Sequence, residues 1–229
     1  MRLRERNPVR IGFRGLVKVT CRPDISGLDH IPDTGGFIVA SNHLSFFDSV
    51  LLQSMLPRLV RFFAKAEYFT APGINGKLQK SFFESVGSIP VDRGQKAASV
   101  AALDRLVEFL DKGEGVGIYP EGTRSRDGRL YRGKTGVGWL ALTTGAPVIP
   151  VGLTGTDRLQ PPGRNLIVPH KFGLTVGEPL QFEKIGPKHK PKLRRQITDE
   201  IMDAIAQLTG QERVDSYNSA ASAEQDTEN

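Results

Sequence analysis

The chain has 229 residues, which is long enough for one well-buried domain and short for two. Its single cysteine, Cys21, excludes an internal disulfide and a cluster of thiolate metal ligands. With a net charge of +6, a basic surface of this protein could face nucleic acid, anionic lipid or only solvent. The chain contains no recognisable nucleic-acid-binding module.

The N-terminal segment, residues 1–24, is strongly basic. Over residues 1–22 it carries Arg2, Arg4, Arg6, Arg10, Arg14, Lys18 and Arg22 against one acidic residue, Glu5. Asn7 and Pro8 are typical of an N-cap and a first helical residue, whereas residues 17–20 alternate like a strand. Because basic residues beside apolar ones favour a lipid surface, we expect this segment to face an anionic membrane; a solvated basic surface is the alternative.

Apolar runs in the chain are short. None approaches the roughly 20 residues that span a bilayer, and the basic start lacks the apolar centre of a signal peptide. We therefore expect a protein without a transmembrane segment that associates peripherally with the cytoplasmic face of the cell membrane.

The rest of the chain alternates between short apolar runs and longer segments with helical spacing. Strands are expected at residues 17–26, 36–41, 61–64, 85–91, 116–119, 148–153, 166–168 and 174–176. Helices are expected at residues 49–59, 96–112, 137–144 and 193–208. This pattern predicts a single α/β domain over residues 25–210, with a central mostly parallel or mixed sheet flanked by helices, and a disordered acidic tail over residues 211–229.

Residues 42–48 contain the most informative spacing of the chain. His43 is followed five positions later by Asp48, so the carboxylate can bend back across a tight turn to meet one ring nitrogen. The other nitrogen then stays available to take a proton, which makes the pair a general base with an orienting partner. For an isolated pair, a capping or core histidine is the alternative.

Three further blocks follow in order, at residues 87–94 (GSIPVDRG), 121–124 (EGTR) and 148–152 (VIPVG). Together with residues 42–48 they resemble the glycerolipid acyltransferase superfamily, which includes bacterial 1-acyl-glycerol-3-phosphate acyltransferases. The resemblance spans roughly residues 25–185 and implies the single-domain α/β fold of that superfamily.

The resemblance also implies a mechanism, namely direct transfer of an acyl group from a thioester to an alcohol. His43 would remove the proton of the attacking hydroxyl, and Asp48 would hold the tautomer and stabilise the imidazolium. Ser45, within the same block, is expected to be a turn or capping hydroxyl rather than a nucleophile. No metal or other cofactor is expected, because the base and the phosphate contacts are protein groups.

The phosphate of an acceptor needs cations, and arginine suits this task because its planar fork contacts two phosphate oxygens at once. The candidate substrate-binding residues are Arg124, Glu121, Gly122, Thr123, Arg93, Lys65 and Lys134. Arg124 is expected to bind the phosphate, whereas Glu121 and Gly122 orient the turn.

Residues 128–135 (GRLYRGKT) match the G-x4-G-K-[ST] pattern of nucleotide phosphate loops. Such a loop requires a buried strand that leads directly to the first glycine, but Gly128 follows the polar residues 123–127. A nucleotide-binding protein that uses Gly128–Thr135 is therefore the less favoured alternative.

These patterns together predict an enzyme that acylates 1-acyl-glycerol-3-phosphate (lysophosphatidic acid) to phosphatidic acid in phospholipid synthesis. The expected donor is acyl-CoA, with acyl carrier protein as the alternative; glycerol-3-phosphate, another lysophospholipid or a glycolipid are alternative acceptors. Aromatic residues mixed with basic ones between the first two blocks also suit a membrane headgroup region. They are Phe62, Phe63, Tyr68, Phe69, Phe82 and Phe83.

Overall fold

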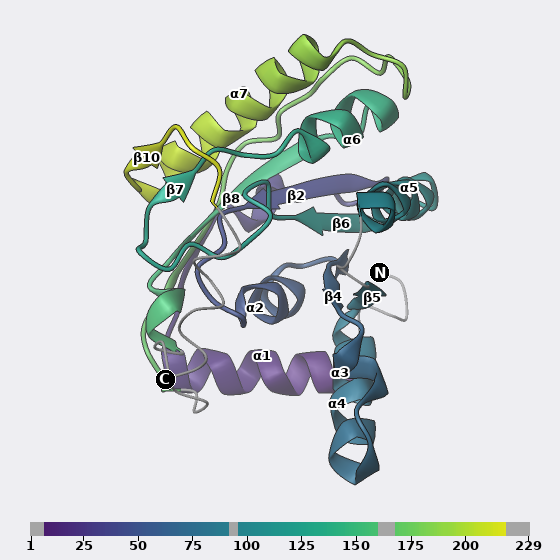
Figure 1. Ribbon diagram of the computed structural model, residues 1–229. Coiled ribbons are helices and arrows are strands. Elements are labelled where there is room, and N and C mark those ends of the chain that lie inside the picture. Colours follow the sequence, from purple (N-terminus) through teal and green to yellow (C-terminus); the bar gives the residue numbers. More distant parts are fainter. Residues whose placement is uncertain (1–6, 92–95, 160–167, 219–229) are drawn as a thin grey trace.

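A six-stranded sheet forms the centre of the computed structural model, which describes residues 7–91, 96–159 and 168–218 (Figure 1). For Lys65 and residues 96–100 it describes the backbone only. Across the sheet the strands are β1 (Asp24–Ser26), β9 (Gly173–Val176), β8 (Val148–Thr154), β2 (Phe37–Ser41), β6 (Gly115–Ile118) and β3 (Val60–Arg61). Neighbouring strands are parallel except β8 and β9, so the prediction of a mostly parallel central sheet is confirmed.

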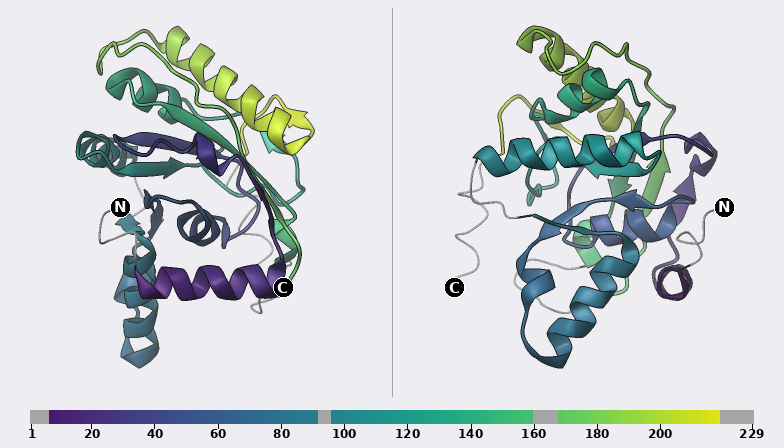
Figure 2. Two further views of the ribbon diagram at one scale, coloured as in Figure 1. Left: turned by 180° about the vertical axis from the view of Figure 1, so that it is seen from behind. Right: turned by 90° about the vertical axis from the view of Figure 1, so that its right-hand side faces the viewer.

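Helices cover both faces of this sheet (Figures 1 and 2). One face packs against α1 (Pro8–Cys21) and α2 (Asp48–Met55), and the other against α5 (Lys96–Asp111), α6 (Gly136–Thr144) and α7 (Pro191–Thr209). Phe37 and Val39 of β2 join the core on the first side, whereas Ile38 and Ala40 join the core on the second. The continuous apolar run of β2 is thus explained by burial on both faces of the strand.

A smaller unit projects from the lower part of the molecule in Figure 1. It consists of β4 (Phe63–Lys65), α3 (Glu67–Thr70), α4 (Gly73–Val86) and β5 (Ile89–Val91), with β4 and β5 paired in parallel. The strand predicted at 85–91 is correct only for β5, because its first residues belong to α4. This helix was not predicted, since Gly73 and Gly76 lower its helix propensity.

The N-terminal helix α1 begins at the predicted N-cap: the Asn7 side chain accepts a hydrogen bond from the amide of Val9 at 2.9 Å. The first part of the strand predicted at 17–26 is wrong, because residues 17–21 belong to α1 and β1 starts only at Asp24. Val17 and Cys21 lie four residues apart and are both buried, which is the spacing of one helix face.

Arg10 was predicted to belong to a membrane-facing basic segment, but it is buried between α1 and α2, with only 3% exposed. Its guanidinium donates to the backbone carbonyls of Gln53 at 2.7 Å, of Leu56, and of Arg58 at 3.3 Å. These carbonyls lie at or just beyond the C-terminal end of α2, where a helix lacks donors of its own and carries the negative end of its dipole. Arg10 therefore stabilises α2.

Residues 211–218, which follow α7, pack on the domain, so the disorder predicted from residue 211 is wrong for this part of the chain. β10 (Arg213–Val214) pairs in parallel with β7 (Leu130–Tyr131). The strand predicted at 166–168 is not found at Val168, and its other residues lie outside the described part. The described ranges also include the short 3-10 helices η2 (Leu28–His30) and η3 (Thr156–Leu159). No helix in the described ranges is both long and apolar enough to cross a membrane.

Candidate active site

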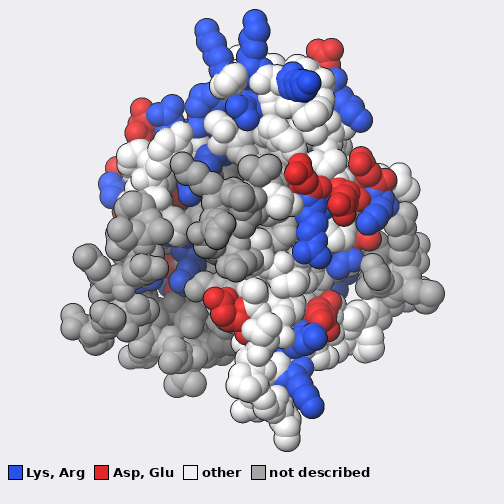
Figure 3. All heavy atoms as spheres, turned by 45° about the vertical axis from the view of Figure 1, so that its right-hand side comes forward, with Lys and Arg blue, Asp and Glu red and all other residues white. Residues whose placement is uncertain are grey.

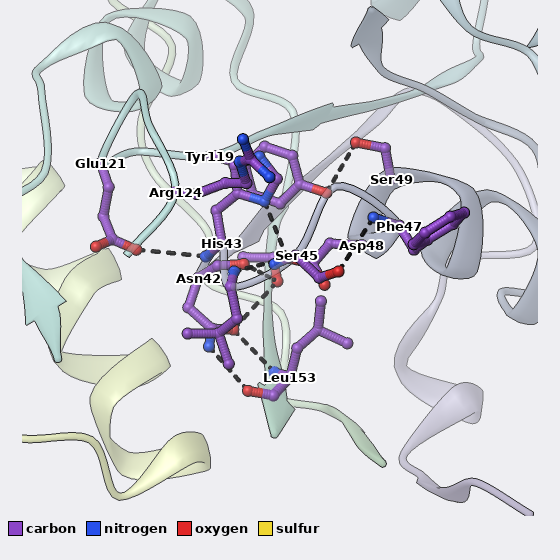
Figure 4. Close-up of polar contacts among 12 residues, drawn as sticks. Asn42, His43, Ser45, Phe47, Asp48, Ser49, Tyr119, Glu121, Arg124 and Leu153 are labelled. Atoms are coloured by element: carbon purple, nitrogen blue, oxygen red, sulfur yellow. Dashed lines mark hydrogen bonds and ion pairs between the residues drawn. The ribbon is translucent and has the colours of Figure 1, made fainter. Parts of the chain in front are cut away.

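The turn between β2 and α2 brings His43 against Asp48 (Figure 4). Nδ1 of His43 donates to Oδ2 of Asp48 at 2.9 Å, and the same oxygen accepts the backbone amides of Leu44 and Ser45, each at 2.7 Å. Because these donors converge on one carboxylate oxygen, Asp48 fixes the turn and the imidazole together. The predicted contact of the two side chains is confirmed; its catalytic role stays a prediction.

The imidazole of His43 lines a pocket. The side chain is 13% exposed, and Nε2 has no hydrogen-bond partner among the residues that the structure describes. Since Nδ1 carries the donated hydrogen, Nε2 of the neutral ring is an acceptor. Asp48 is fully buried at the first residue of α2, where the positive end of the helix dipole favours a carboxylate.

Two neighbours of His43 act on the backbone. Oγ of Ser45 accepts the amide of Phe47 at 3.3 Å, so the predicted turn hydroxyl is confirmed. The buried side chain of Asn42 instead reaches β8, where it donates to the carbonyl and accepts from the amide of Leu153, both at 2.8 Å. It also donates to Oε1 of Gln211 at 2.8 Å. Asn42 therefore joins β2 to β8 and to the segment after α7.

A tyrosine that the sequence reasoning did not select lies against the face of the imidazole. The ring of Tyr119 stacks on His43, with ring centroids 3.8 Å apart and planes inclined by 6°. Its hydroxyl lies 3.0 Å from Oγ of Ser49 in α2. Its position in the sequence could have identified Tyr119 as a site residue, because it ends a predicted strand and directly precedes Pro120 and the E-G-T-R block.

Glu121 connects the two sequence blocks inside the protein, with 1% of the residue exposed. Oε1 accepts the amide of His43 at 3.3 Å, and Oε2 accepts the amide of Tyr131 at 3.0 Å. Burial raises the pKa of Glu121 from 4.5 to about 7, and the two amides offset only part of this rise. Figure 4 shows Glu121 and Asp48 on opposite sides of His43. Glu121 thus orients the backbone of the turn that carries His43, and its burial argues against direct contact with a substrate.

Ser125 adds a second link between the same two blocks, since its amide donates to the carbonyl of His43 at 2.7 Å. Between Glu121 and Ser125 the chain turns sharply at Gly122, whose φ is +76°. A Cβ at Gly122 would lie 2.8 Å from Nζ of Lys134, so glycine is needed for both the backbone conformation and the close approach of the lysine. Lys134 therefore lies over the E-G-T-R turn, where a cation was predicted.

Arg124 and His43 line the same pocket, so the structure brings the predicted base and the predicted phosphate ligand together. Arg124 is exposed, and Thr123 beside it is half-buried. The other residues that line the pocket are Phe46, Ser49, Val50, Phe63, Ala64, Tyr68, Phe83 and Ser88. The pocket thus combines apolar side chains, four of them aromatic counting Tyr68, with polar groups that include His43 and Arg124.

For two of the predicted cations the structure describes no side chain. Arg93 lies outside the described residues, and for Lys65 only the backbone at the end of β4 is described. Ala64, next to Lys65, lines the pocket. Within the described part, no group of three or more His, Cys, Asp or Glu side chains is arranged to hold a metal ion.

The segment Gly128–Thr135 does not form a nucleotide phosphate loop. Such a loop offers its backbone amides to the phosphates, but here the amides are used within the protein. The amides of Leu130, Tyr131, Arg132 and Lys134 donate to Glu212, Glu121, Ser216 and Pro120, respectively. Part of the segment is also the strand β7. The nucleotide-binding alternative is therefore rejected.

Comparison with known proteins identifies one family and several relatives. The family model described as acyltransferase matches residues 22–154. The chloroplastic 1-acyl-sn-glycerol-3-phosphate acyltransferase LPAT1 of Arabidopsis thaliana is 38% identical over 164 residues, which are 70% of this chain and 44% of that protein. The 1-acyl-sn-glycerol-3-phosphate acyltransferase of Bacillus subtilis is 31% identical over 204 residues, which are 87% of this chain and 92% of that protein.

A solved structure extends the likeness to the fold. The crystal structure of the 1-acyl-sn-glycerophosphate acyltransferase PlsC from Thermotoga maritima matches with a TM-score of 0.61 and 27% sequence identity, and the match covers 91% of this chain and 84% of that one. The chain spans less than half the length of the chloroplastic LPAT1 and of its Brassica napus counterpart BAT2.

Proposed function

The chain belongs to the acyltransferase family, and from this premise we propose that it transfers a fatty acyl group from acyl-CoA to the free hydroxyl of 1-acyl-sn-glycerol-3-phosphate. The product is phosphatidic acid, an intermediate of phospholipid synthesis. One observation carries the proposal: His43, paired with Asp48, lines a pocket that Arg124 also lines, in a chain whose relatives are named for this activity.

The reaction needs a base, because an alcohol is a poor nucleophile until its proton is removed. Nε2 of His43 takes the hydroxyl proton while the alcohol oxygen attacks the thioester carbonyl carbon. Asp48 stabilises the imidazolium that forms. When the carbon–sulfur bond breaks, the imidazolium returns the proton to the departing thiolate, which leaves as a thiol. The transfer therefore balances without an acyl-enzyme.

Recognition of the acceptor phosphate falls to Arg124 and Lys134. Arginine can contact two phosphate oxygens in a fixed geometry, and lysine adds a point charge. Nζ of Lys134 lies over Gly122, next to the turn that carries Arg124 and that Glu121 ties to the backbone of His43. This arrangement holds the phosphate site at a constant distance from the base.

The apolar wall of the pocket suits an acyl chain, since Phe46, Val50, Phe63 and Phe83 contribute to it. Either acyl-CoA or acyl carrier protein presents such a chain as a thioester, and the proposal takes acyl-CoA as donor with acyl carrier protein as the alternative. Base and phosphate ligands are side chains of this protein, so the proposed mechanism uses no cofactor.

A lipid acceptor implies contact with a membrane, and α1 together with α4 offers a suitable surface. The two helices pack on each other through Phe13 and Phe82, whose rings lie 5.6 Å apart, and Phe83 of α4 reaches the pocket. Their exposed apolar side chains are Val9, Ile11, Leu16 and Val19 on α1, and Ile74 and Leu78 on α4. The exposed basic residues on or next to them are Lys18, Arg22, Lys77 and Lys80. The proposal therefore includes peripheral association of this surface with anionic lipid on the cytoplasmic face of the cell membrane.

Charge alone does not select this surface. Figure 3 shows Lys and Arg side chains gathered at the top of the molecule. The segment before α7 exposes Lys184, Lys188 and Lys190. In the same view α4 projects at the bottom as a mostly uncharged tip with a few basic side chains beside it. A headgroup region accommodates apolar and basic groups together, which favours the surface of α1 and α4 over the more basic top.

Thiol release from acyl-CoA, measured across a panel of acceptors, tests the proposed function. We expect 1-acyl-sn-glycerol-3-phosphate to be acylated faster than glycerol-3-phosphate, a zwitterionic lysophospholipid or a glycolipid, with His43→Ala as the control for spontaneous hydrolysis. A faster rate with another acceptor would reassign the substrate. No acyl transfer to any of them, with either acyl-CoA or acyl carrier protein as donor, would overturn the proposal.

A further inference from the structure

The segment Gln211–Asn218, here called the C-terminal strap, leaves α7 and runs along the loops of the active site. Its strand β10 pairs with β7, and Figure 1 shows this last coloured part of the chain beside β7. Two carbonyls of the strap, those of Glu212 and Ser216, accept the amides that flank Tyr131 in the chain, at 2.9 and 3.0 Å. The strap thus holds β7 on one edge while the amide of Tyr131 donates to Glu121 on the other.

The side chain of Gln211 makes a direct link to the catalytic turn. Its Oε1 accepts from Nδ2 of Asn42 at 2.8 Å, and its Nε2 donates to the carbonyl of Gly128 at 2.7 Å. Asn42 is fully buried and immediately precedes His43. Removing the Gln211 amide leaves a buried N–H of Asn42 without its acceptor, and a buried donor in that state is costly.

The far end of the strap reaches the predicted phosphate ligand. Nδ2 of Asn218 donates to the backbone carbonyl of Arg124 at 3.0 Å. Because this bond is made by the backbone, it fixes the position of Arg124 without occupying the guanidinium. The strap is therefore tied to Asn42, to Glu121 through Tyr131, and to Arg124, all of which lie in the sequence blocks that define the site.

We propose that the C-terminal strap is a positioning element of acyl transfer: Gln211 holds the backbone that carries His43, and Asn218 holds Arg124 where the acceptor phosphate binds. Neither residue lines the pocket, so each acts through the residue that it contacts. The roles of His43 and Arg124 in this inference rest on the proposed function, whereas the contacts of the strap do not.

Steady-state kinetics of two single variants test the strap. Gln211→Ala should lower kcat about 3- to 10-fold and leave both KM values near wild type. Asn218→Ala should raise KM for the phosphorylated acceptor about 3- to 10-fold and leave KM for the thioester unchanged. Arg213→Ala is the matched control, because its side chain pairs with Asp203 of α7 and not with the active site. This control should leave kcat and both KM values at wild-type levels.

Hydrogen exchange gives a second readout that does not depend on the substrate. In Gln211→Ala the amides of residues 41–45 and of Leu153 should exchange faster than in wild type and in Arg213→Ala. If the wild type acylates no acceptor but this exchange pattern appears, the proposed function fails, whereas the positioning of residues 41–45 by Gln211 stands. Wild-type kinetics in both variants, or losses that only follow the melting temperature as in the control, would overturn the proposal, as would unchanged exchange at residues 41–45.

Discussion

His43 is held by contacts of different kinds on different atoms. Asp48 accepts from Nδ1, Tyr119 stacks on the ring face, and Glu121 accepts the backbone amide. Together they fix the direction of Nε2 and leave it as the acceptor at the pocket. A base that is already oriented loses little entropy when the substrate hydroxyl arrives, which is how positioning lowers the barrier.

The stack of Tyr119 on His43 should contribute to turnover through its ring rather than its hydroxyl. The ring face attracts a cation, so it stabilises the imidazolium that forms during transfer. Tyr119→Leu should lower kcat about 3- to 10-fold, whereas Tyr119→Phe, which keeps the ring, should stay within about twofold of wild type. Ser49→Ala removes the partner of the hydroxyl and should match Tyr119→Phe in the same acyl-transfer assay. Equal losses in Tyr119→Phe and Tyr119→Leu would assign the effect to the hydroxyl instead.

The buried carboxyl of Glu121 should make stability depend on pH. Burial raises its pKa from 4.5 to about 7, so the folded protein binds this proton more tightly than the unfolded chain does. The contribution of Glu121 to the free energy of unfolding is therefore fully present below pH 4.5 and falls as the pH rises to about 7. Above that value it no longer changes with pH. Relative to Glu121→Gln, which does not titrate, the wild type should lose up to about 3 kcal/mol of unfolding free energy over this interval. Urea unfolding at several pH values measures the difference, and parallel curves for the two proteins would show that Glu121 titrates normally.

At the scale of elements, strands and helices with regular spacing were predictable, whereas the second part of α1 and the helices α3 and α4 were not. The continuous apolar run of β2 and the apolar stripe of α7 follow directly from burial, and both were predicted close to their observed limits. In α1, alternation over residues 17–20 suggested a strand, but only Val17 of these residues is buried, and Val19 is 75% exposed. A short alternating run cannot reveal which of its residues meet a neighbouring helix. In α4, glycines obscured a helix that packing on α1 and α3 stabilises.

The cation at the end of α2 should matter for stability. Arg10 is buried and donates to carbonyls that the helix itself leaves without donors. Arg10→Ala should lower the free energy of unfolding by about 2 to 3 kcal/mol, because hydrogen bonds from a charged group are lost and the carbonyls stay buried. Lys18→Ala, at an exposed position of the same helix, should change stability by less than about 0.5 kcal/mol in the same denaturant titration. A similar small effect of Arg10→Ala would mean that water replaces the guanidinium without cost.

At the scale of the whole molecule, the surface of α1 and α4 should bind membranes. Ile74 and Leu78 are 78% and 64% exposed at the tip of α4. Replacing both with Asp should weaken binding to anionic vesicles about 100-fold, because apolar burial is lost and the new charges are repelled by the lipid. Ile185→Asp, at a 47% exposed apolar position on the segment before α7, is the matched control and should bind like wild type. Co-sedimentation at low and high salt measures the effect, and weaker binding of the control alone would place the membrane at the opposite end of the molecule.

The active site was predictable from the sequence where neighbours in the chain make the contact. His43 and Asp48 meet within one turn, and residues 121–124 form a second turn. Spacing and residue type along the sequence are therefore enough to predict both turns. The contacts of Tyr119 and of the C-terminal strap depend on how distant segments pack, and no local pattern encodes them. For the same reason Arg10 was assigned to the surface, since only the tertiary structure shows that its side chain turns inward.

The central claim is that His43 is the base for acyl transfer to 1-acyl-sn-glycerol-3-phosphate. The most direct measurement is kcat for His43→Ala, with acyl-CoA and this acceptor at saturating concentration and the melting temperature of each protein recorded. The side chain is partly exposed and contributes little to the core, so the variant should melt like wild type while kcat falls about 10²- to 10⁴-fold. A folded His43→Ala protein that keeps half of the wild-type rate would contradict the claim.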